Sequence, residues 1–442
     1  MELYSTKHTS PNVNLKEAVF KGLPDDNGLF MPTVIPRLEQ SFLDNIENYS
    51  FQVIAFEICR TLMQGEVPDN DLEEIINDSM NMEAPLVPVT QDMLCLELFH
   101  GPSLAFKDFG ARFMARLMSY FLQKEQKEIN ILVATSGDTG SAVAQGFYKA
   151  PGIKVTILYP KGKVSLNQEK QLTTLGENIT ALEVDGVFDD CQHLVKSAFL
   201  DQELNKQMNL SSANSINIAR LIPQSFYYMN TYARLKKEGR PLVFSVPSGN
   251  FGNLCGGLIA REMGMPVEKF VAATNVNDIV PEYINSGLFN PRPSVQTLSN
   301  AMDVGNPSNF PRLLAMHDGN YDKMKAAIDG RAYNDDITLY AIKKVYDETG
   351  YTMCPHTAVA FLGLTDYLKS RDITSYVSTS ATPLGVFLST AHPSKFKDTV
   401  EDTIGKPVDM PERLQKIIER EKHSIPMGKD VEGFKEWLLD NR

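Results

Sequence analysis

The stretch LELFHGPSLAFKDFG, Leu96 to Gly110, places one cationic side chain, Lys107, between two phenylalanines and directly after the apolar run Leu104-Ala105-Phe106. Lysine is almost never fully buried unless an anion pairs with it or its charge is removed. Two interpretations follow. Either Lys107 points to solvent from a short loop, or an apolar setting lowers its pKa and makes it a nucleophilic amine that can attack an aldehyde.

Two loops contain groups that could bind an anion. The segment ATSGDTGSA, Ala134 to Ala142, combines glycines, serines and threonines at an expected junction between a strand and a helix, where backbone N–H groups and the helix dipole favour negative charge. The segment PSGNFGNLCGG, Pro247 to Gly257, follows another expected strand, and its glycines allow a ligand to approach the backbone closely. The alternative for both segments is a polar turn that only caps a helix.

Two further segments carry polar groups of the same kind. In SANSINIARLIPQ, Ser212 to Gln224, the side chains of Asn214, Ser215 and Arg220 offer amide, hydroxyl and guanidinium donors, although a capped helix with a surface arginine is the ordinary alternative. STAHPSKF, Ser389 to Phe396, is a hydroxyl-rich turn. A reactive lysine together with several anion-binding loops matches an aldehyde cofactor that carries a phosphate, which is pyridoxal phosphate.

Short aliphatic runs separated by segments of helix length must position these loops. This alternation predicts an α/β protein built of doubly wound, mainly parallel sheets, in which ligands sit at the carboxyl ends of the strands. Asp108 is expected to cap a helix with an apolar face, and residues up to about Val89 are expected to form a mostly helical N-terminal unit. The predicted strands are Ile129 to Thr135, Lys154 to Pro160, Ile179 to Gly186, Leu242 to Gly249, Lys269 to Thr274 and Ser375 to Ser380.

The composition limits the classes of partner. The chain has 442 residues, of which 43% are hydrophobic and 22% charged, which is typical of a globular protein with two or three domains. A formal net charge of −12 without a basic stripe argues against nucleic acid as a partner. The sequence shows neither an N-terminal signal pattern nor an apolar run long enough for a membrane span, so we expect a cytoplasmic protein. Five scattered cysteines without CxxC spacing predict no disulfide framework and no metal site.

In this order the motifs LFHGPSLAFKDFG, ATSGDTGSA, SANSINIAR, PSGNFGN and STAHPSKF resemble those of the threonine synthase family, and the N-terminal NLKEAVFKGLPDDNGLFMP and the segment PHTAVAFLGL fit as well. The resemblance covers nearly the whole chain. It implies a pyridoxal-phosphate enzyme with the tryptophan synthase β-like fold, which converts O-phospho-L-homoserine and water to L-threonine and phosphate. The implied domains are residues 1–90 (N-terminal), 91–125 with 215–400 (large, cofactor-binding), 126–214 (small, substrate-binding) and 401–442 (C-terminal helices), in a monomer or a homodimer.

The resemblance also implies roles for particular residues. Lys107 matches the lysine that forms a Schiff base with the cofactor, and Thr390 matches the hydroxyl partner of the pyridine nitrogen. The loop around the cofactor phosphate corresponds to Gly249, Asn250, Phe251, Gly252 and Asn253. The loop that holds the substrate carboxylate corresponds to Thr135, Ser136, Asp138 and Thr139. The pocket for the substrate phosphate corresponds to Asn214, Ser215 and Arg220.

Two positions depart from the family pattern. Asp138 stands where shorter members have asparagine. An ionised carboxylate there would repel the substrate carboxylate and the phenolic oxygen of the cofactor, which the same loop borders. Cys354 stands where an acidic residue is usual. For the nearby His356, structural hydrogen bonds at a helix start are expected, and a role as a proton carrier is the alternative. Three alternatives stay open at this stage: a β-eliminating relative such as a serine or threonine dehydratase, another phosphohomoserine lyase that omits the addition of water, and a non-catalytic protein that keeps the fold in order to bind a ligand.

Overall fold

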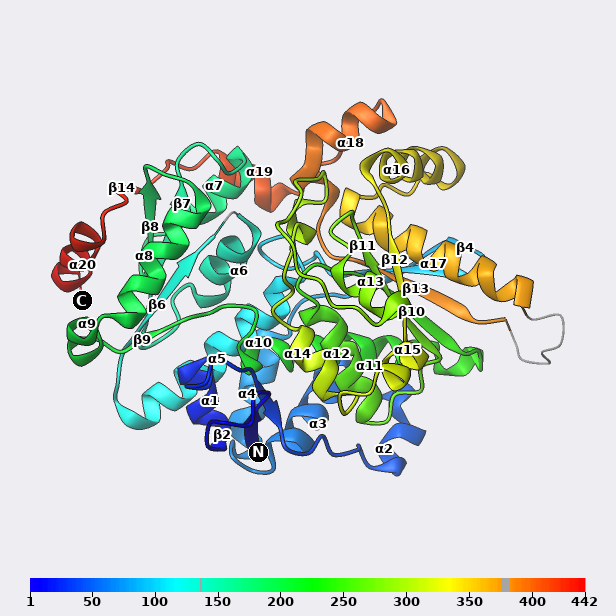
Figure 1. Ribbon diagram of the computed structural model, residues 1–442, viewed down its shortest axis with the longest axis horizontal. Helices are drawn as coiled ribbons and strands as arrows, with labels where there is room; N and C mark the ends of the chain where they lie inside the picture. Colours follow the sequence, from blue (N-terminus) through cyan, green and yellow to red (C-terminus); the bar gives the residue numbers. More distant parts are fainter. Residues whose placement is uncertain (136, 375–381, 442) are drawn as a thin grey trace.

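The computed structural model describes residues 1–135, 137–374 and 382–441, and two largely parallel sheets organise the chain (Figure 1). The larger sheet has the strand order β12-β11-β10-β13-β5-β4, with all neighbours parallel except β4 and β5, which are antiparallel. The central strands β10, β11 and β13 are apolar and almost entirely buried, as helix-covered parallel sheets require, whereas the edge strands β4 and β12 are partly exposed. The six strands are β4 (Leu86–Thr90), β5 (Met93–Glu97), β10 (Leu242–Pro247), β11 (Lys269–Thr274), β12 (Ile328–Ala332) and β13 (Leu384–Ser389).

The smaller sheet has the order β14-β8-β7-β6-β9, and all its neighbours are parallel. Its strands are β6 (Ile129–Ala134), β7 (Ile153–Pro160), β8 (Ile179–Val184), β9 (Leu210–Ser211) and β14 (Ile425–Met427). The helices of this half of the molecule are α6 (Asp138–Phe147), α7 (Leu166–Thr173), α8 (Phe188–Leu200), α9 (Gln202–Gln207) and the C-terminal α20 (Val431–Asp440).

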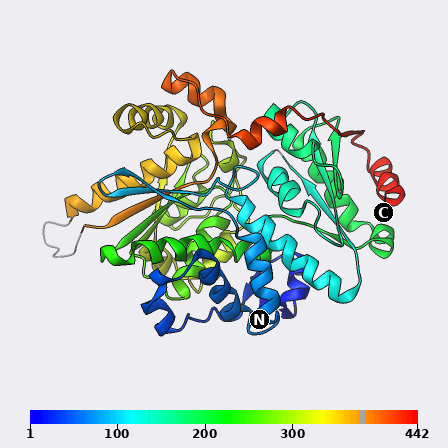
Figure 2. The same cartoon turned by 180° about the vertical axis from the view of Figure 1, so that it is seen from behind.

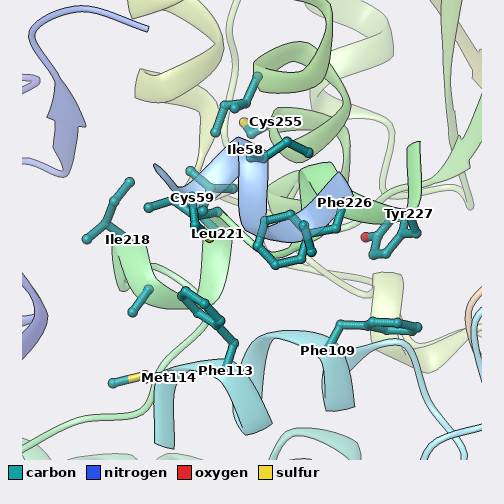
Figure 3. Packing of buried hydrophobic residues seen from close by; sticks show 14 of the residues in the cluster. Ile58, Cys59, Phe109, Phe113, Met114, Ile218, Leu221, Phe226, Tyr227 and Cys255 are labelled. Carbon is teal, nitrogen blue, oxygen red and sulfur yellow. The ribbon is translucent and has the colours of Figure 1, made fainter. Parts of the chain in front are cut away.

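Helix α5 (Lys107–Glu125) joins the two halves. It leaves the edge of the larger sheet, packs against α6 of the smaller half and contacts the short α10 (Ile218–Leu221), which in turn touches α12 (Gly252–Glu262). Phe113 of α5 meets Phe226 of α11 (Gln224–Leu235) edge to face, with ring centroids 5.8 Å apart, in the core shown in Figure 3. These contacts fix the start of α5, and therefore Lys107, against both halves.

The N-terminal unit packs against α5 and α11 and lies along one side of the molecule in both views (Figures 1 and 2). It contains the expected helices α1 (Leu15–Lys21), α2 (Gln40–Asp44), α3 (Phe51–Met63) and α4 (Asp69–Ser79). It also contains a small antiparallel sheet of order β2-β1-β3, formed by β1 (Glu2–Ser5), β2 (Val13–Asn14) and β3 (Phe30–Pro32).

The remaining helices belong mainly to the larger half, and α17 packs on β10, β11 and β13. They are α13 (Ile279–Ser286), α14 (Phe310–Ala315), α15 (Tyr321–Ala327), α16 (Asp335–Thr349), α17 (Pro355–Thr374), α18 (Lys397–Ile404) and α19 (Glu412–Ile418), with the 3₁₀ turns η1 (Ile46–Asn48), η2 (Lys236–Glu238), η3 (Asn300–Met302) and η4 (Pro393–Phe396). After α18 the chain crosses to the smaller half, where β14 pairs with β8 (Figure 1).

The expected α/β architecture with parallel sheets and helical ends is confirmed, and five of the six predicted strands are present within a residue or two of the expected bounds. The sixth, Ser375 to Ser380, lies outside the described residues. The expected cap at Asp108 is wrong: α5 begins at Lys107 without a side-chain cap, and the Asp108 carboxylate instead accepts a hydrogen bond from Ser103 N at 2.8 Å. The domain boundaries stay a prediction, although β4 ends at the first of them and β14 lies in the segment expected to be only helical.

Candidate active site

Lys107 stands where the larger sheet meets α5. The segment before it is held by backbone hydrogen bonds to the residues after β13: Phe106 N donates to Thr390 O at 2.9 Å, and His392 N donates to Leu104 O at 3.0 Å. Because β5 and β13 are parallel neighbours, both segments leave the carboxyl edge of the sheet side by side. The structure therefore brings Lys107 and Thr390 together although they are far apart in the sequence.

The amine of Lys107 lies between the two halves of the molecule. Its Nζ donates a hydrogen bond to Oγ1 of Thr139 on α6, at 3.2 Å. Burial lowers the pKa of Lys107; the charge of Asp138 acts in the opposite direction, while the charges of Lys395 and Arg220 lower the pKa further. A lowered pKa favours the neutral amine, which is the form that attacks a carbonyl group.

The loop before α6 is folded around the side chain of Thr135. Its Oγ1 accepts hydrogen bonds from Gly137 N and Gly140 N, both at 2.9 Å, and Thr135 is buried. A Cβ on Gly140 would lie 2.4 Å from Cγ2 of Thr135, so only glycine fits there. The Thr135 hydroxyl oxygen thus shapes the turn, and the described hydroxyl that meets Lys107 comes from Thr139. Ser136, which the sequence also suggested, lies outside the described residues.

Asp138 forms a buried ion pair that the sequence did not reveal. Its Oδ1 lies 2.7 Å from Nζ of Lys395 and accepts a hydrogen bond from Nε2 of Gln168 at 3.1 Å. Burial alone would raise the pKa of Asp138, but the charges of Lys395 and Lys107, with the two hydrogen bonds, hold the pKa below its ordinary value. Lys395 therefore compensates the charge of Asp138, which without a partner would repel bound anions.

Arg220 projects from α10 toward α5. The side chain is buried, Nη1 donates to Ala213 O at 2.6 Å, and a Cβ on Gly110 would lie 3.0 Å from Nε. Nε has no hydrogen-bond partner among the described residues. Burial lowers the pKa of Arg220 to about 10, which leaves the guanidinium charged at neutral pH. The structure thus directs an unpaired cationic donor toward the face of α5 that also carries Lys107.

The glycine loop after β10 leads into α12. Phe251 adopts a left-handed backbone (φ 61°), and α12 begins at Gly252 without a side-chain cap. A Cβ on Gly249 would lie 2.7 Å from Cα of Met302, so the backbone approach requires glycine. Asn253 is buried, its Oδ1 accepts hydrogen bonds from two tyrosine hydroxyls, and its Nδ2 has no partner among the described residues. Free backbone N–H groups and an unpaired amide donor suit an anion.

A direct contact joins this loop to the segment before α10. Nδ2 of Asn250 donates to Oγ of Ser215 at 3.2 Å, and the carbonyl of Asn250 accepts from Nδ2 of the buried Asn309 at 2.9 Å. Asn214 is exposed and borders a cavity of about 950 Å³ between α1, α8 and β9, whose lining does not include Lys107. The structure therefore unites Ser215 with Asn250 and places Asn214 at the border of a separate hollow.

These donors fit a cofactor that carries both an aldehyde and a phosphate. Burial shifts the Lys107 amine toward its neutral, more nucleophilic form, and the uncapped start of α12 with the unpaired Nδ2 of Asn253 offers donors for the phosphate. The described residues hold no cluster of three His, Cys, Asp or Glu side chains that could bind a metal ion.

Three further residues belong to this site but were not singled out as site residues from the sequence. Lys395 lies in the STAHPSKF segment, Gln168 lies in the first turn of α7, and His356 lies in the first turn of α17. Nε2 of His356 accepts from Ala301 N at 3.2 Å, which confirms the expected structural hydrogen bond. Burial lowers the pKa of His356 to about 4, so it is neutral at physiological pH. The sequence placed Lys395 in the STAHPSKF motif, but nothing in that motif indicated that Asp138 would be its partner.

Cys354, at the other position that departs from the family pattern, lies beside two buried hydroxyl groups. Its Sγ lies 3.2 Å from Oγ1 of Thr357, whose hydroxyl lies 2.7 Å from Oγ of Ser389 at the end of β13. All three residues are buried, and burial raises the pKa of the Cys354 thiol. A small neutral thiol thus joins the start of α17 to the carboxyl edge of the larger sheet.

Comparison with known proteins places the chain in a family. Residues 88–379 match the pyridoxal-phosphate dependent enzyme family, residues 2–80 match the threonine synthase N terminus and residues 371–438 match the threonine synthase C-terminal domain. The chain is 44% identical to threonine synthase from Escherichia coli (strain K12) over 94% of each chain. None of the helices in the described ranges is long and apolar enough to cross a membrane.

Solved structures agree over the full length. The crystal structure of threonine synthase from Escherichia coli superposes with a TM-score of 0.88 at 41% identity and covers 100% of both chains. The structure of pyridoxal-phosphate-bound threonine synthase from Brucella melitensis superposes with a TM-score of 0.93 at 31% identity, over 100% of this chain and 99% of that one. The chain with this two-sheet fold and buried amine therefore belongs to the threonine synthase family of pyridoxal-phosphate-dependent enzymes.

Proposed function

We propose that the chain converts O-phospho-L-homoserine and water to L-threonine and phosphate, with Lys107 as the reacting amine. The observation that carries this assignment is the position of Lys107: its Nζ lies at the carboxyl edge of the larger sheet and donates to Thr139 of the smaller half. Pyridoxal phosphate, when bound, supplies an electron sink for the carbanions that form on the substrate. Family membership and full-length similarity support the same reaction.

In this proposal Lys107 holds the cofactor aldehyde and then moves protons. Its freed amine would take the proton from Cα of the substrate, pass that proton on, and only then take a proton from Cβ. Phosphate would then leave from Cγ with the electron pair of its C–O bond, Cγ and Cα would each regain a proton, and water would add at Cβ. The lowered pKa of Lys107 keeps a fraction of the amine able to accept those protons near neutral pH. The hydrogen bond to Thr139 limits where the amine can point, and such positioning is a large part of enzymatic rate enhancement.

The other residues hold the two phosphates and the carboxylate. Residues 249–253 would hold the cofactor phosphate at the start of α12, and the Thr390 hydroxyl would be the hydrogen-bond partner of the pyridine nitrogen. Thr135, Ser136, Asp138 and Thr139 orient the substrate carboxylate. Arg220, with Ser215, holds the leaving phosphate, whereas Asn214, which the resemblance also implied, borders the separate hollow. The unpaired Nε of Arg220 supports this last role, because a buried guanidinium with a free donor attracts an oxyanion.

The same proposal concerns the substrate, the compartment and the assembly of the enzyme. The substrate is a small phosphorylated amino acid, and the negative net charge of the chain disfavours nucleic acid as a partner. We place the enzyme in the cytoplasm, as a monomer or a homodimer. Sedimentation of the purified chain would decide between the two assemblies.

Phosphate release and threonine formation from O-phospho-L-homoserine test the function. Lys107→Ala should abolish both, while Lys124→Ala, which alters an exposed lysine of the same helix, should leave both unchanged. Borohydride trapping followed by peptide mapping should label Lys107. Label elsewhere, or wild-type turnover by Lys107→Ala, would overturn the assignment. Turnover of L-serine instead of the phosphorylated substrate would favour a dehydratase.

Arg220→Ala tests the phosphate pocket. Because one charge-assisted hydrogen bond to the leaving group is lost, kcat/KM for O-phospho-L-homoserine should fall by about 100-fold or more. Arg234→Ala removes a partly exposed arginine of α11 that only donates to a backbone carbonyl, and its kcat/KM should stay close to that of the wild type. An unchanged kcat/KM in Arg220→Ala would remove Arg220 from the pocket.

A further inference from the structure

Lys395 is an almost fully buried lysine beside the proposed site. Its side chain is 2% exposed, and its Nζ lies 2.7 Å from Oδ1 of Asp138 and donates to Ser103 O at 3.1 Å. It belongs to η4, which follows β13 of the larger sheet, whereas Asp138 starts α6 of the smaller half. The ion pair therefore crosses between the two halves within a few residues of Thr390 and Thr139.

The loop at Ser103 does not depend on Lys395 alone. Ser103 N donates to Asp108, and Ser103 O also accepts from Nε2 of Gln171 at 3.3 Å. Removing one partner of a buried ion pair is strongly destabilising in proteins, while replacing the whole pair by neutral groups is often tolerated. An ion pair kept at this position, next to a reactive amine, needs a reason beyond anchoring the loop.

We propose that Lys395 is a positioning residue that holds the Asp138 carboxylate, and with it the start of α6, beside the Lys107 amine. The proposal rests on the function above in one respect, since Lys107 is taken as the reacting group. Lys395 then has two effects on Lys107: it fixes the helix that carries Thr139, and it cancels the attraction that Asp138 would otherwise exert on the protonated amine.

The charged and titratable groups around Lys107 determine the direction in which each substitution should shift the pKa of Lys107. Asp138 of α6 favours the protonated amine, whereas Lys395 of η4 and Arg220 of α10 disfavour it. His356 of α17, which feels the same charges, is neutral at physiological pH. Loss of Lys395 should therefore raise the pKa of Lys107, and loss of the Asp138 charge should lower it. A purely structural role for the pair predicts no such opposition.

The test measures the Lys107 amine in protein prepared without cofactor. Acetic anhydride is applied between pH 6 and 10, and the acetylation rate of Lys107 is followed by peptide mass mapping. At pH 8, Lys395→Met should react severalfold more slowly than the wild type, because a raised pKa of Lys107 lowers the fraction of neutral amine. Asp138→Asn should react faster, and the double variant Asp138→Asn/Lys395→Met should return close to the wild-type rate.

Two variants serve as controls. Lys397→Met removes the nearby exposed lysine that faces Glu401 and should leave the Lys107 rate unchanged. Lys395→Arg keeps the charge and should stay close to the wild type. Thermal denaturation shows whether Lys395→Met is folded. If it is not, the double variant, which leaves no unpaired charge, is compared with Asp138→Asn alone. Lys107 should then react more slowly in the double variant than in Asp138→Asn.

The reconstituted enzyme gives an independent readout. Lys395→Met should lose at least tenfold in kcat with a smaller change in KM, and Lys395→Arg should recover part of the loss. Equal shifts of the acetylation rate in Asp138→Asn and Lys395→Met, or no shift in either, would overturn the role of Lys395 and leave the proposed function intact. Activity in Lys107→Ala would overturn the proposed function without affecting the acetylation result.

Discussion

Neighbouring residues of α5 serve different purposes because a helix turns by about 100° per residue. Lys107 faces Thr139, whereas Phe109, two residues later, is fully buried, with its ring centroid 5.3 Å from that of Tyr227 and 6.0 Å from that of Phe51 (Figure 3). Phe109 therefore belongs to the core. Asp108, between them, is buried and clamps the preceding loop.

The buried carboxyl of Asp108 makes stability depend on pH. Burial raises its pKa to about 6, above the ordinary 3.8, so the folded state binds a proton more tightly than the unfolded state. This contribution to stability is present below pH 4 and is lost as the pH rises through 6. Asp108→Asn should therefore unfold with a free energy about 2 to 3 kcal/mol higher than the wild type at pH 8.

Denaturant titrations of the wild type and of Asp108→Asn at pH 4, 6 and 8 measure this effect. The difference between the two proteins should shrink toward pH 4, where the wild-type carboxyl is protonated. Asp402→Asn, at an exposed position of α18, should show no comparable pH dependence. A difference that grows as the pH falls would contradict the assignment.

At the scale of elements, the start of α6 depends on a glycine. Gly137 precedes the helix with φ 138°, in a region that other residues avoid, and a Cβ there would lie 2.4 Å from Cδ of Gln168. Nε2 of Gln168 donates to Asp138, and Oε1 of Gln168 accepts a hydrogen bond from Ser165 N in the capping box at the start of α7. The position of Asp138 thus follows from close packing between two helices of the smaller half.

Gly137→Ala should disturb both the fold and the site. Backbone strain costs about 1 to 3 kcal/mol, and the displaced Gln168 should also weaken its contact with Asp138, so kcat should fall together with stability. Gly162→Ala is the matched control: its φ is also positive (64°), but nothing lies within 4 Å of the added Cβ, so only about 1 kcal/mol should be lost and kcat should hold. Equal kcat values for the two variants would contradict this account.

At the scale of the whole molecule, the C-terminal segment ties the two halves together. After α18 on the larger half, the chain passes to the smaller half, where β14 pairs with β8 and α20 buries Phe434 and Leu438 against α8. On the way Lys422 forms ion pairs with Glu169 at 2.8 Å and with Glu183 at 3.0 Å. We therefore propose that the C-terminal residues of β14 and α20 move with residues 126–214.

Deletion of residues 425–442 should loosen the smaller half selectively. Without β14 the strand β8 becomes an unprotected sheet edge, and the apolar surface under α20 is exposed. Hydrogen exchange followed by mass spectrometry should show faster exchange in Ile179–Val184. Exchange in Leu242–Pro247 of the larger sheet, the internal control, should stay slow. Equal protection of both strands before and after deletion would show that the segment is dispensable.

The sequence by itself determined the local elements and the residues able to react. Aliphatic runs and three-and-four spacing are local patterns, so the strand β10 and the helix α5 could be located to within a residue or two. Ordered motifs identified Lys107, whereas its meeting with Thr390 depends on β5 and β13, which are not among the strands predicted from the sequence. Sequence patterns are informative here because each depends on neighbours within a few residues.

The tertiary structure alone decided which distant groups meet. The partner of Lys395 lies 257 positions away, and the contact joins η4, which follows β13 of the larger sheet, to α6, which follows β6 of the smaller sheet. The sequence likewise held no signal for the pairing of β14 with β8 or for the clamp between Asp108 and Ser103. The physical reason is the same in each case: burial and charge compensation depend on the packing of the whole chain, which local residue patterns do not encode.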